Sequence, residues 1–442
     1  MLLLTNGKIL TFNKKSEIIE NGAILIKDDK IAEVGNTENL KDKYPKVEEF
    51  DVKGKIVMPG LVNTHMHFYS TFARGMDLKT DQPPQDFVDI LEKLWWRLDE
   101  NLNKDDIYYS TIYALLSSIK SGTTTIFDHH ASYGYINGSL DIISKAVKKA
   151  GIRANLSYEI SDRNGKVKAE KALNENERFL KKLDDKDNTL SGTIGLHASF
   201  TLSDDTLTET AALSENLNIP IHIHSAEGYA DVKDSKDKGY KGVIDRLDNY
   251  NLWKRNSLAI HGVHLQKDEY EVLKENGVNL IHNPESNMSN AVGAAPVNKA
   301  FQKGVRIGLG TDGYTTDMFE SLSVANLLQT HERGNPSVGG ELVQNMAFQN
   351  NQNIASEYFG ENLGVIEKGN LADIIVLDYK TPTPINSQNI FGHILMGFKG
   401  GIVDSTIVNG NILMKNQEVK VLDEEKLLSR TKKQAEDFWK RF

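Results

Sequence analysis

The chain of 442 residues contains no cysteine. Disulfide bonds and thiolate metal sites are therefore both excluded. The zinc site of cytidine deaminases is excluded too, because its Pro-Cys-x-x-Cys motif supplies two thiolates. Any metal site in this protein has to be built from histidine nitrogens and carboxylate oxygens.

Long apolar runs and positive charge are also scarce. No apolar stretch approaches the roughly 18 residues that a membrane-spanning helix needs, and the apolar run at 1–4 is followed at once by a polar turn at 5–7. We therefore expect no signal peptide and no membrane anchor. The net charge of −9 argues against an electrostatic nucleic-acid binder. The expectation is a cytoplasmic protein with a small-molecule partner, and a homodimer is left open.

The central part of the chain alternates short apolar runs with amphipathic stretches. Eight strands are predicted, at residues 60–64, 123–127, 153–158, 191–196, 220–223, 258–260, 278–281 and 306–309. The intervening helices are predicted at 140–150, 169–183, 207–217, 243–250, 268–276 and 296–303. This order favours an α/β fold, a (β/α)₈ barrel. The competing open sheet of dinucleotide-binding proteins has no support, because no Gly-x-Gly-x-x-Gly follows a strand.

Both ends of the chain are rich in predicted strands. We expect residues 1–57 and 364–442 to join as one discontinuous β-sandwich domain, with the barrel at 58–363 between them. The segment 76–103, which contains two adjacent prolines and the pair Trp95-Trp96, interrupts the first barrel unit. It is either an embellishing helix packed on the barrel or a lid with an aromatic face toward a flat substrate.

Polar residues follow nearly every predicted barrel strand. The first strand leads into His65 and His67, whose i, i+2 spacing puts both side chains on one face, about 7 Å apart at the backbone. Of the twelve histidines, all but His331 and His393 lie at or just past a predicted strand end. Packing alone explains this poorly, because each buried imidazole would need its own polar partner.

Four of these residues suit one divalent cation: His65, His67, His224 and Asp312. Three neutral nitrogens and one carboxylate fit Zn²⁺, the preferred ion, or Fe²⁺, and leave room for a water. Such an ion lowers the pKa of bound water to about 7. His222 lies on the same strand face as His224 and competes with it as a ligand.

A second group is predicted to move protons. Glu227 lies three residues past His224, where the chain leaves the strand, and we assign it the proton shuttle. His261 is placed to orient or deprotonate the water, and Asp312 to hold it. Two structural alternatives remain: Glu227 could cap the following helix, and His261 could only support a ligand.

Five motifs, at residues 59–67, 224–227, 259–264, 282–287 and 308–312, together resemble the amidohydrolase superfamily. More narrowly they resemble its chlorohydrolase and deaminase branch, and residues 128–132 and 159–165 are similar to the SsnA group of aminohydrolases. The resemblance covers essentially the whole chain. It implies a metal held by His65, His67, His224 and Asp312, with Glu227 and His261 as the catalytic pair. Because the fourth strand lacks the lysine that bridges two metals in some members, it also implies a mononuclear site.

The resemblance implies in addition that His197 and His282 line the substrate pocket. Arg74, His130, Glu159, Asp162 and Arg163 are further candidates for contact with the substrate ring. The predicted function is a hydrolytic deaminase: metal hydroxide attacks a purine-like or pterin-like heterocycle and ammonia leaves. The alternatives are a metal hydrolase that cleaves an amide or a carbon–halide bond and, more remotely, a non-catalytic scaffold. A scaffold should have lost ligands, whereas all the residues named above are present.

Overall fold

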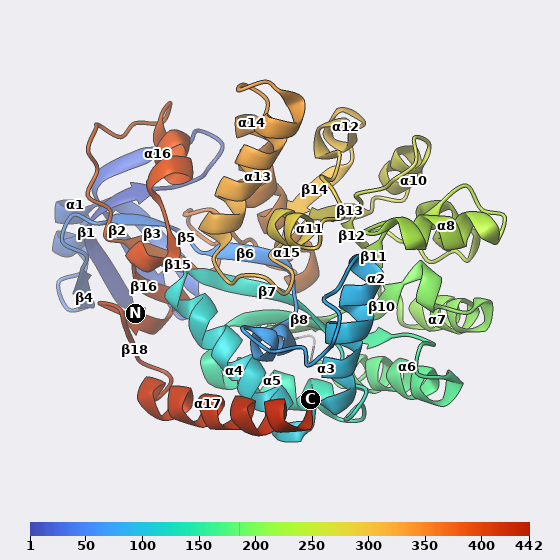
Figure 1. Cartoon of the computed structure of the whole chain (residues 1–442). Helices are drawn as coiled ribbons and strands as arrows, with labels where there is room; N and C mark the ends of the chain where they lie inside the picture. Colours follow the sequence, from blue (N-terminus) through green and yellow to red (C-terminus); the bar gives the residue numbers. More distant parts are fainter. Residues whose placement is uncertain (185) are drawn as a thin grey trace.

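A barrel of parallel strands forms the centre of the computed structural model, which describes residues 1–184 and 186–442 (Figure 1). Its strands are β6 (Leu61–Met66), β7 (Thr123–His130), β8 (Arg153–Ile160), β10 (Ile194–Ala198), β11 (Ile221–Ser225), β12 (Leu258–His261), β13 (Asn279–His282) and β14 (Arg306–Leu309). Neighbours pair in parallel in the order β14-β13-β12-β11-β10-β8-β7-β6. The ring closes where the backbone N–H groups of Thr311 and Asp312 both donate to His65 O at 3.0 Å. The predicted (β/α)₈ barrel is confirmed.

Helices surround the barrel and follow the predicted order. They are α4 (Lys104–Lys120), α5 (Ser139–Ala150), α6 (Lys166–Leu180), α7 (Asp204–Leu217), α8 (Tyr229–Asp237), α9 (Val243–Asn249), α10 (Glu269–Glu275), α11 (Pro284–Ser289), α12 (Val297–Gln302), α13 (Met318–Arg333), α14 (Gly340–Asn345) and α15 (Asn351–Phe359). In α5, Leu140, Ile143 and Val147 share one buried face, as the 3.6-residue period requires. The helix ends at Gly151, whose φ of 75° is the left-handed conformation that glycine adopts without strain.

A second sheet joins the two ends of the chain, as predicted (Figure 1). Its strands are β1 (Leu2–Leu10), β2 (Ile18–Lys27), β3 (Lys30–Asn36), β4 (Glu48–Asp51), β5 (Ile56–Pro59), β15 (Ile374–Leu377), β16 (Val403–Val408), β17 (Asn411–Lys415) and β18 (Glu418–Val419). Strand β5 is the junction, because it pairs with β1 on one side and with β15 on the other. Leu4, Ile24, Val376 and Ile407 lie in one buried cluster, so residues from both ends share a core. The boundaries at 57/58 and 363/364 stay a prediction.

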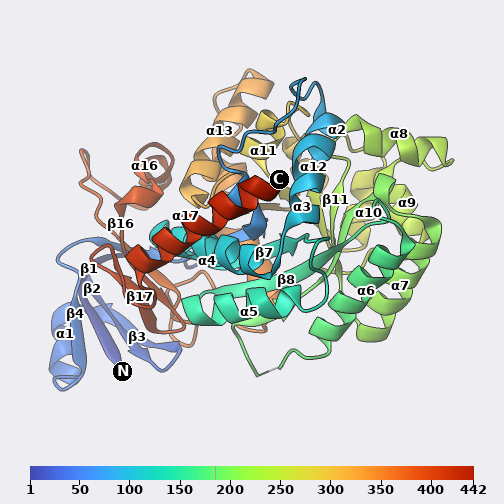
Figure 2. The ribbon, with the colours of Figure 1, turned by 60° about the horizontal axis from the view of Figure 1, so that its bottom comes forward.

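Two elements differ from the simplest expectation. The predicted strand 191–196 is split into β9 (Leu190–Gly192) and β10, and Thr193 between them donates its hydroxyl to Asn155 at 2.9 Å. The last helix, α17 (Glu424–Arg441), leaves the second sheet and lies along α4 of the barrel (Figure 2). Arg441 holds it there through Asp106 at 2.8 Å.

The remaining elements are short. They are α1 (Thr37–Lys43), η1 (Phe68–Ala73), α2 (Phe87–Ile90), the π-helical turn η2 (Leu91–Trp95), α3 (Trp96–Asn101), η3 (Ser199–Thr201), a second π-helical turn η4 (Met346–Asn350), α16 (Ile390–Gly397) and η5 (Gly400–Ile402). In the part of the chain that the structure describes, no helix has the length and apolar character needed to cross a membrane.

Candidate metal centre and active site

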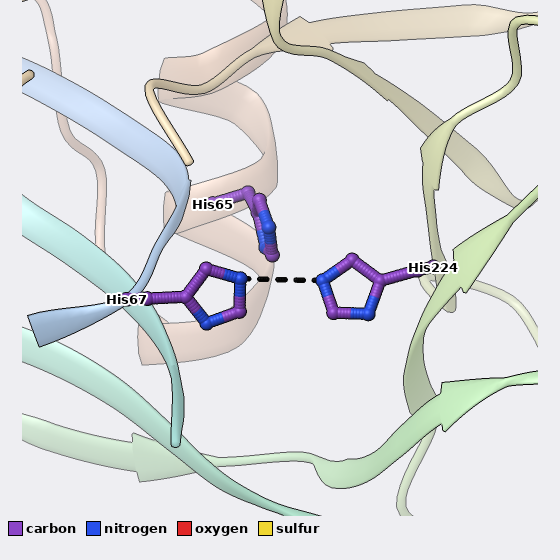
Figure 3. Close-up of side chains that lie close together, drawn as sticks. All are labelled: His65, His67 and His224. Carbon is purple, nitrogen blue, oxygen red and sulfur yellow. Dashed lines mark hydrogen bonds between the residues drawn. The ribbon is translucent and has the colours of Figure 1, made fainter. Parts of the chain in front are cut away.

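The predicted metal ligands lie together at the carboxyl ends of the barrel strands. His65 and His67 come from the end of β6, His224 from β11, and Asp312 from just after β14. The three imidazoles point toward one another, with 3.3 Å between Nε2 of His67 and Nε2 of His224 (Figure 3). Oδ1 of Asp312 is 3.2 Å from Nε2 of His67 and 3.9 Å from Nε2 of His65. Three segments distant in the sequence therefore bring four donor atoms to one point.

The outer ring nitrogens of these histidines are already occupied. Nδ1 of His67 contacts the carbonyl of His129, and Nδ1 of His224 contacts the carbonyl of His197 at 2.9 Å. Contacts of this kind fix the ring orientation and leave Nε2 free for a cation. Nδ1 of His65 shares a hydrogen bond of 2.8 Å with Nε2 of His222. His222 thus lies behind His65 and supports it, instead of competing with His224 for the same position.

The donor set fits a zinc-like or iron-like ion. Nε2 of His65 is buried and has no hydrogen-bond partner among the described residues, which is costly unless something else binds it. Burial, with the neighbouring histidines, lowers the pKa of His65 and of His224 well below the usual range, so both rings are neutral, as ligands must be. Burial raises the pKa of Asp312, but the His67 hydrogen bond and charge outweigh it and hold the carboxylate ionised.

His67 differs from the other two rings. Burial lowers its pKa, but the hydrogen bond and negative charge of Asp312 outweigh burial and raise it above the ordinary value. Without a cation between them, His67 and Asp312 therefore behave as an ion pair. A divalent ion would take the place of the proton that holds this pair together.

Glu227 and His261 lie beside this centre. Oε2 of Glu227 is 3.2 Å from Nε2 of His261, which in turn is 3.5 Å from Oδ2 of Asp312. Burial raises the pKa of Glu227 well above the usual range, and the charge of Asp312 raises it further. The structure places Glu227 in the pocket wall, where a protonated carboxyl can give its proton to a bound molecule.

A pocket of about 710 Å³, including its open mouth, covers the centre. One wall comes from the segment 76–103, which contributes Phe87, Leu91, Trp95, Trp96 and Asp99. Its aromatic face therefore points into the site, and this orientation agrees with the lid interpretation. Movement of the segment stays a prediction.

The candidate substrate contacts divide into two groups. His197, Glu159 and Arg163 line the pocket. His130 is one layer behind, with its ring edge on Tyr69, which lines the pocket, and His282 is buried with no hydrogen bond to either ring nitrogen among the described residues.

Two further candidates lie away from the pocket. Arg74 is exposed on the turn after η1 and is not brought to the site, because η1 carries the chain away from the end of β6. Asp162 accepts hydrogen bonds from Ser203 N at 2.7 Å and from the Thr206 hydroxyl at 2.9 Å, so it ties down the start of α7 instead.

Sequence reasoning did not find several residues of the site. Ser286 donates to Oδ2 of Asp312 at 2.7 Å, and Asn287 holds Nδ1 of His261 at 3.2 Å; both come from α11. Asn290 donates to Glu227 at 3.4 Å. Asp99 reaches the pocket from α3. The one sequence feature that could have indicated this is its i, i+3 spacing from Trp96, which puts both side chains on one helix face.

Residues 56–413 match the family described as the amidohydrolase family. The 5'-deoxyadenosine deaminase of Methanosarcina acetivorans is 34% identical over 444 residues, which cover 99% of this chain and 98% of that protein. The chain belongs to the amidohydrolase family. The predicted class, a hydrolase that acts on carbon–nitrogen bonds, is confirmed with it.

Solved structures share the fold at lower identity. An adenosine deaminase from Xanthomonas campestris with bound zinc has a TM-score of 0.87 at 21% identity, and the match covers 100% of this chain and 99% of that one. A zinc complex of atrazine chlorohydrolase from Arthrobacter aurescens has a TM-score of 0.82 at 20% identity, covering 98% and 100%. These matches show the fold. The 5'-deoxyadenosine deaminase relative agrees with the predicted chlorohydrolase and deaminase branch. The narrower likeness to the SsnA group stays a prediction.

Proposed function

We propose that this protein is a divalent-metal-dependent aminohydrolase that replaces the amino group of a purine-like heterocycle with oxygen and releases ammonia. The observation that carries the proposal is the meeting of His65, His67, His224 and Asp312 at one point, with Glu227 and His261 in contact beside them. The full-length similarity to a protein named 5'-deoxyadenosine deaminase supports a purine-like substrate. Zinc is the preferred ion, and iron is the alternative.

His65, His67, His224 and Asp312 would hold the ion, each through one donor atom. A bound divalent ion supplies an activated water, because it lowers the pKa of that water to about 7. The remaining steps belong to side chains. Asp312 is ionised and fixed by Ser286, so one of its oxygens can hold the water and accept a proton from it.

Glu227 would carry protons between the water and the substrate. The oxygen of the activated water would attack the ring carbon that bears the amino group. The ring nitrogen would gain a proton from Glu227, and a second proton would then go to the amino group. The carbon–nitrogen bond breaks and ammonia leaves, so that substrate and water give the oxo-heterocycle and ammonia. His261 orients the attacking oxygen and is itself held by Asn287.

Contacts with the heterocycle would come from pocket residues that lie next to the ligands. His197 is fixed by the Thr201 hydroxyl at 2.8 Å and stands edge-on to Trp96, with 6.1 Å between ring centroids. Trp95 and Trp96 offer flat apolar surface to a planar ring. Glu159 and Arg163 offer polar atoms in the same pocket.

Screening would test this function directly. Metal-loaded protein is incubated with aminopurines, aminopterins and aminopyrimidines, and ammonia release is measured. We expect release from purines that carry the amino group next to a ring nitrogen. Release of chloride from chloro-heterocycles without release of ammonia from any amino-heterocycle would contradict the proposal.

A further inference from the structure

One arginine stands in the pocket, and its charge is already matched. Arg163 is the only lysine or arginine among the described residues that line the pocket. Its side chain is 6% exposed and donates to Oε1 of Glu159 at 2.5 Å and to Oδ2 of Asp99. The guanidinium lies over the ring of Tyr133, 4.5 Å from its centroid, and 5.5 Å from that of Trp96. Two aromatic rings and two carboxyl groups therefore already contact the guanidinium of Arg163.

Arg163, Glu159 and Asp99 form one wall of the pocket, and their charges sum to zero or less. Burial raises the pKa of Glu159, but His197, Arg163 and His129 outweigh burial and hold it at about 2, so Glu159 is ionised. Burial raises the pKa of Asp99 well above its usual range, although Arg163 opposes this. Glu159 alone balances the single positive charge of Arg163, whatever the protonation of Asp99. This wall therefore has no unpaired positive charge that could bind an anion.

Unpartnered atoms at the same wall suit a neutral polar group. Trp96 Nε1 and Arg163 Nε are buried donors without a hydrogen-bond partner among the described residues. Asp99 Oδ1 is a buried oxygen in the same condition. A group such as a hydroxyl or amide, which both donates and accepts, could satisfy them without bringing a charge into the pocket.

On the basis of the proposed aminohydrolase function, we propose that Glu159 and Asp99, by pairing with Arg163, make the pocket select heterocycles whose substituents are uncharged and reject those that carry phosphate or carboxylate. An anion entering this wall would lose its hydration, meet no unpaired cation and face two carboxyl groups. Rejection of this kind is specificity obtained by an unfavourable contact with the wrong ligand.

Binding of two matched ligands tests the proposal. Inosine and inosine 5'-monophosphate differ by one phosphate, and calorimetry gives the dissociation constant of each for the zinc-loaded full chain. We expect inosine to bind about tenfold or more tightly than the monophosphate. In Glu159→Gln, which leaves the charge of Arg163 unmatched, this preference should shrink by about tenfold. Asp99→Asn should shrink it less, because Glu159 remains.

Asp89→Asn is the matched control. It removes one carboxylate from the same segment, where Asp89 pairs with Lys93 at 2.8 Å outside the pocket lining, so the preference should not change. Equal binding of the two ligands by the unmodified protein, or a preference that neither pocket variant alters, would overturn the proposal. If that happens while aminopurines still yield ammonia, only the charge selectivity fails. If neither ligand binds and no aminopurine yields ammonia, the selectivity and the proposed function fail together.

Discussion

Asp231 joins two loops of the active site, and its removal should disable Glu227 without touching the substrate. Asp231, on α8, is 3% exposed. Its Oδ2 accepts from Ala226 N at 2.9 Å, next to Glu227, and its Oδ1 accepts from Phe200 N at 3.0 Å, in the loop that follows His197. In Asp231→Ala the buried N–H of Ala226 and the partly buried N–H of Phe200 lose their acceptor. At about 1–3 kcal/mol each, the free energy of unfolding should fall by ~2–6 kcal/mol.

The catalytic effect follows from the same contacts. Ala226 has a φ of 51°, a conformation that needs support, so losing the Asp231 contact should let Glu227 move. A displacement of about 1 Å at a catalytic group lowers turnover by ~10²-fold. We expect kcat for ammonia release to fall by about that factor while KM changes little, because Asp231 does not line the main pocket.

Asp237→Ala provides the control for this experiment. Asp237 lies on the same helix, is exposed and, among the described residues, pairs only with exposed Lys233, so stability should change by less than ~1 kcal/mol and kcat should not change. Urea unfolding and an ammonia assay on metal-loaded protein measure both effects. The reasoning is refuted if Asp231→Ala loses stability as expected but keeps kcat within about twofold of the unmodified enzyme.

Four further predictions concern the metal, the proton shuttle and the fold. Glu227→Gln should lower ammonia release by ~10²–10⁴-fold with metal content unchanged by elemental analysis; loss of the metal would contradict its assignment as proton shuttle. His65→Ala should lose the ion on dialysis, and an unchanged metal content would remove His65 from the ligand set. Asp373→Ala leaves the fully buried guanidinium of Arg153 without its ion-pair partner. The free energy of unfolding, measured in urea, should therefore fall by ~3–5 kcal/mol. A fall below ~1 kcal/mol would argue against this ion pair as a link between the barrel and the second sheet. Burial raises the pKa of Asp231 to about 7, against its two backbone hydrogen bonds, so the native state keeps a proton that the unfolded chain releases near pH ~4. The Asp231 contribution to stability should therefore fall as pH rises from ~4 to ~7, by up to ~1.4 kcal/mol per unit, and in urea unfolding the stability of Asp231→Asn should fall less than that of the unmodified protein by this amount.

The sequence predicted the barrel and the position of its polar residues because both follow from local periodicity. Parallel strands buried on both faces give short apolar runs, and the residue that follows each run falls at the same rim. His65, His67, His224 and Asp312 could therefore be grouped without knowing any distance. Strand period alone does not distinguish His222 from His224, because they share a face. The motif at 224–227 favoured His224, and the contact between His222 and His65 shows their different depth.

Residues that reach the site from outside the strand ends were not predictable in this way. Asp99 and Trp96 belong to a helical segment whose path over the barrel is set by tertiary packing, including the contact of Arg97 with the carbonyl of Phe442 at 3.0 Å. The position of Arg74 was not predictable for the same reason. It lies close to His67 in the sequence, but the intervening turn η1 carries it to the surface.

Backbone strain at the rim explains how side chains next to one another on a strand reach a common centre. Ala226, His261 and Asp312 all have positive φ, at 51°, 74° and 55°, and none is glycine. Each such residue costs of the order of 1–2 kcal/mol, and an ordinary strand would avoid that cost by continuing its alternation. In an alternating strand Glu227 would face away from His224, because residues three apart point to opposite sides. The left-handed turn at Ala226 breaks the alternation, so that Glu227 lies 3.2 Å from His261. The strain at Ala226, His261 and Asp312 is therefore retained where it brings proton-carrying groups to the metal ligands.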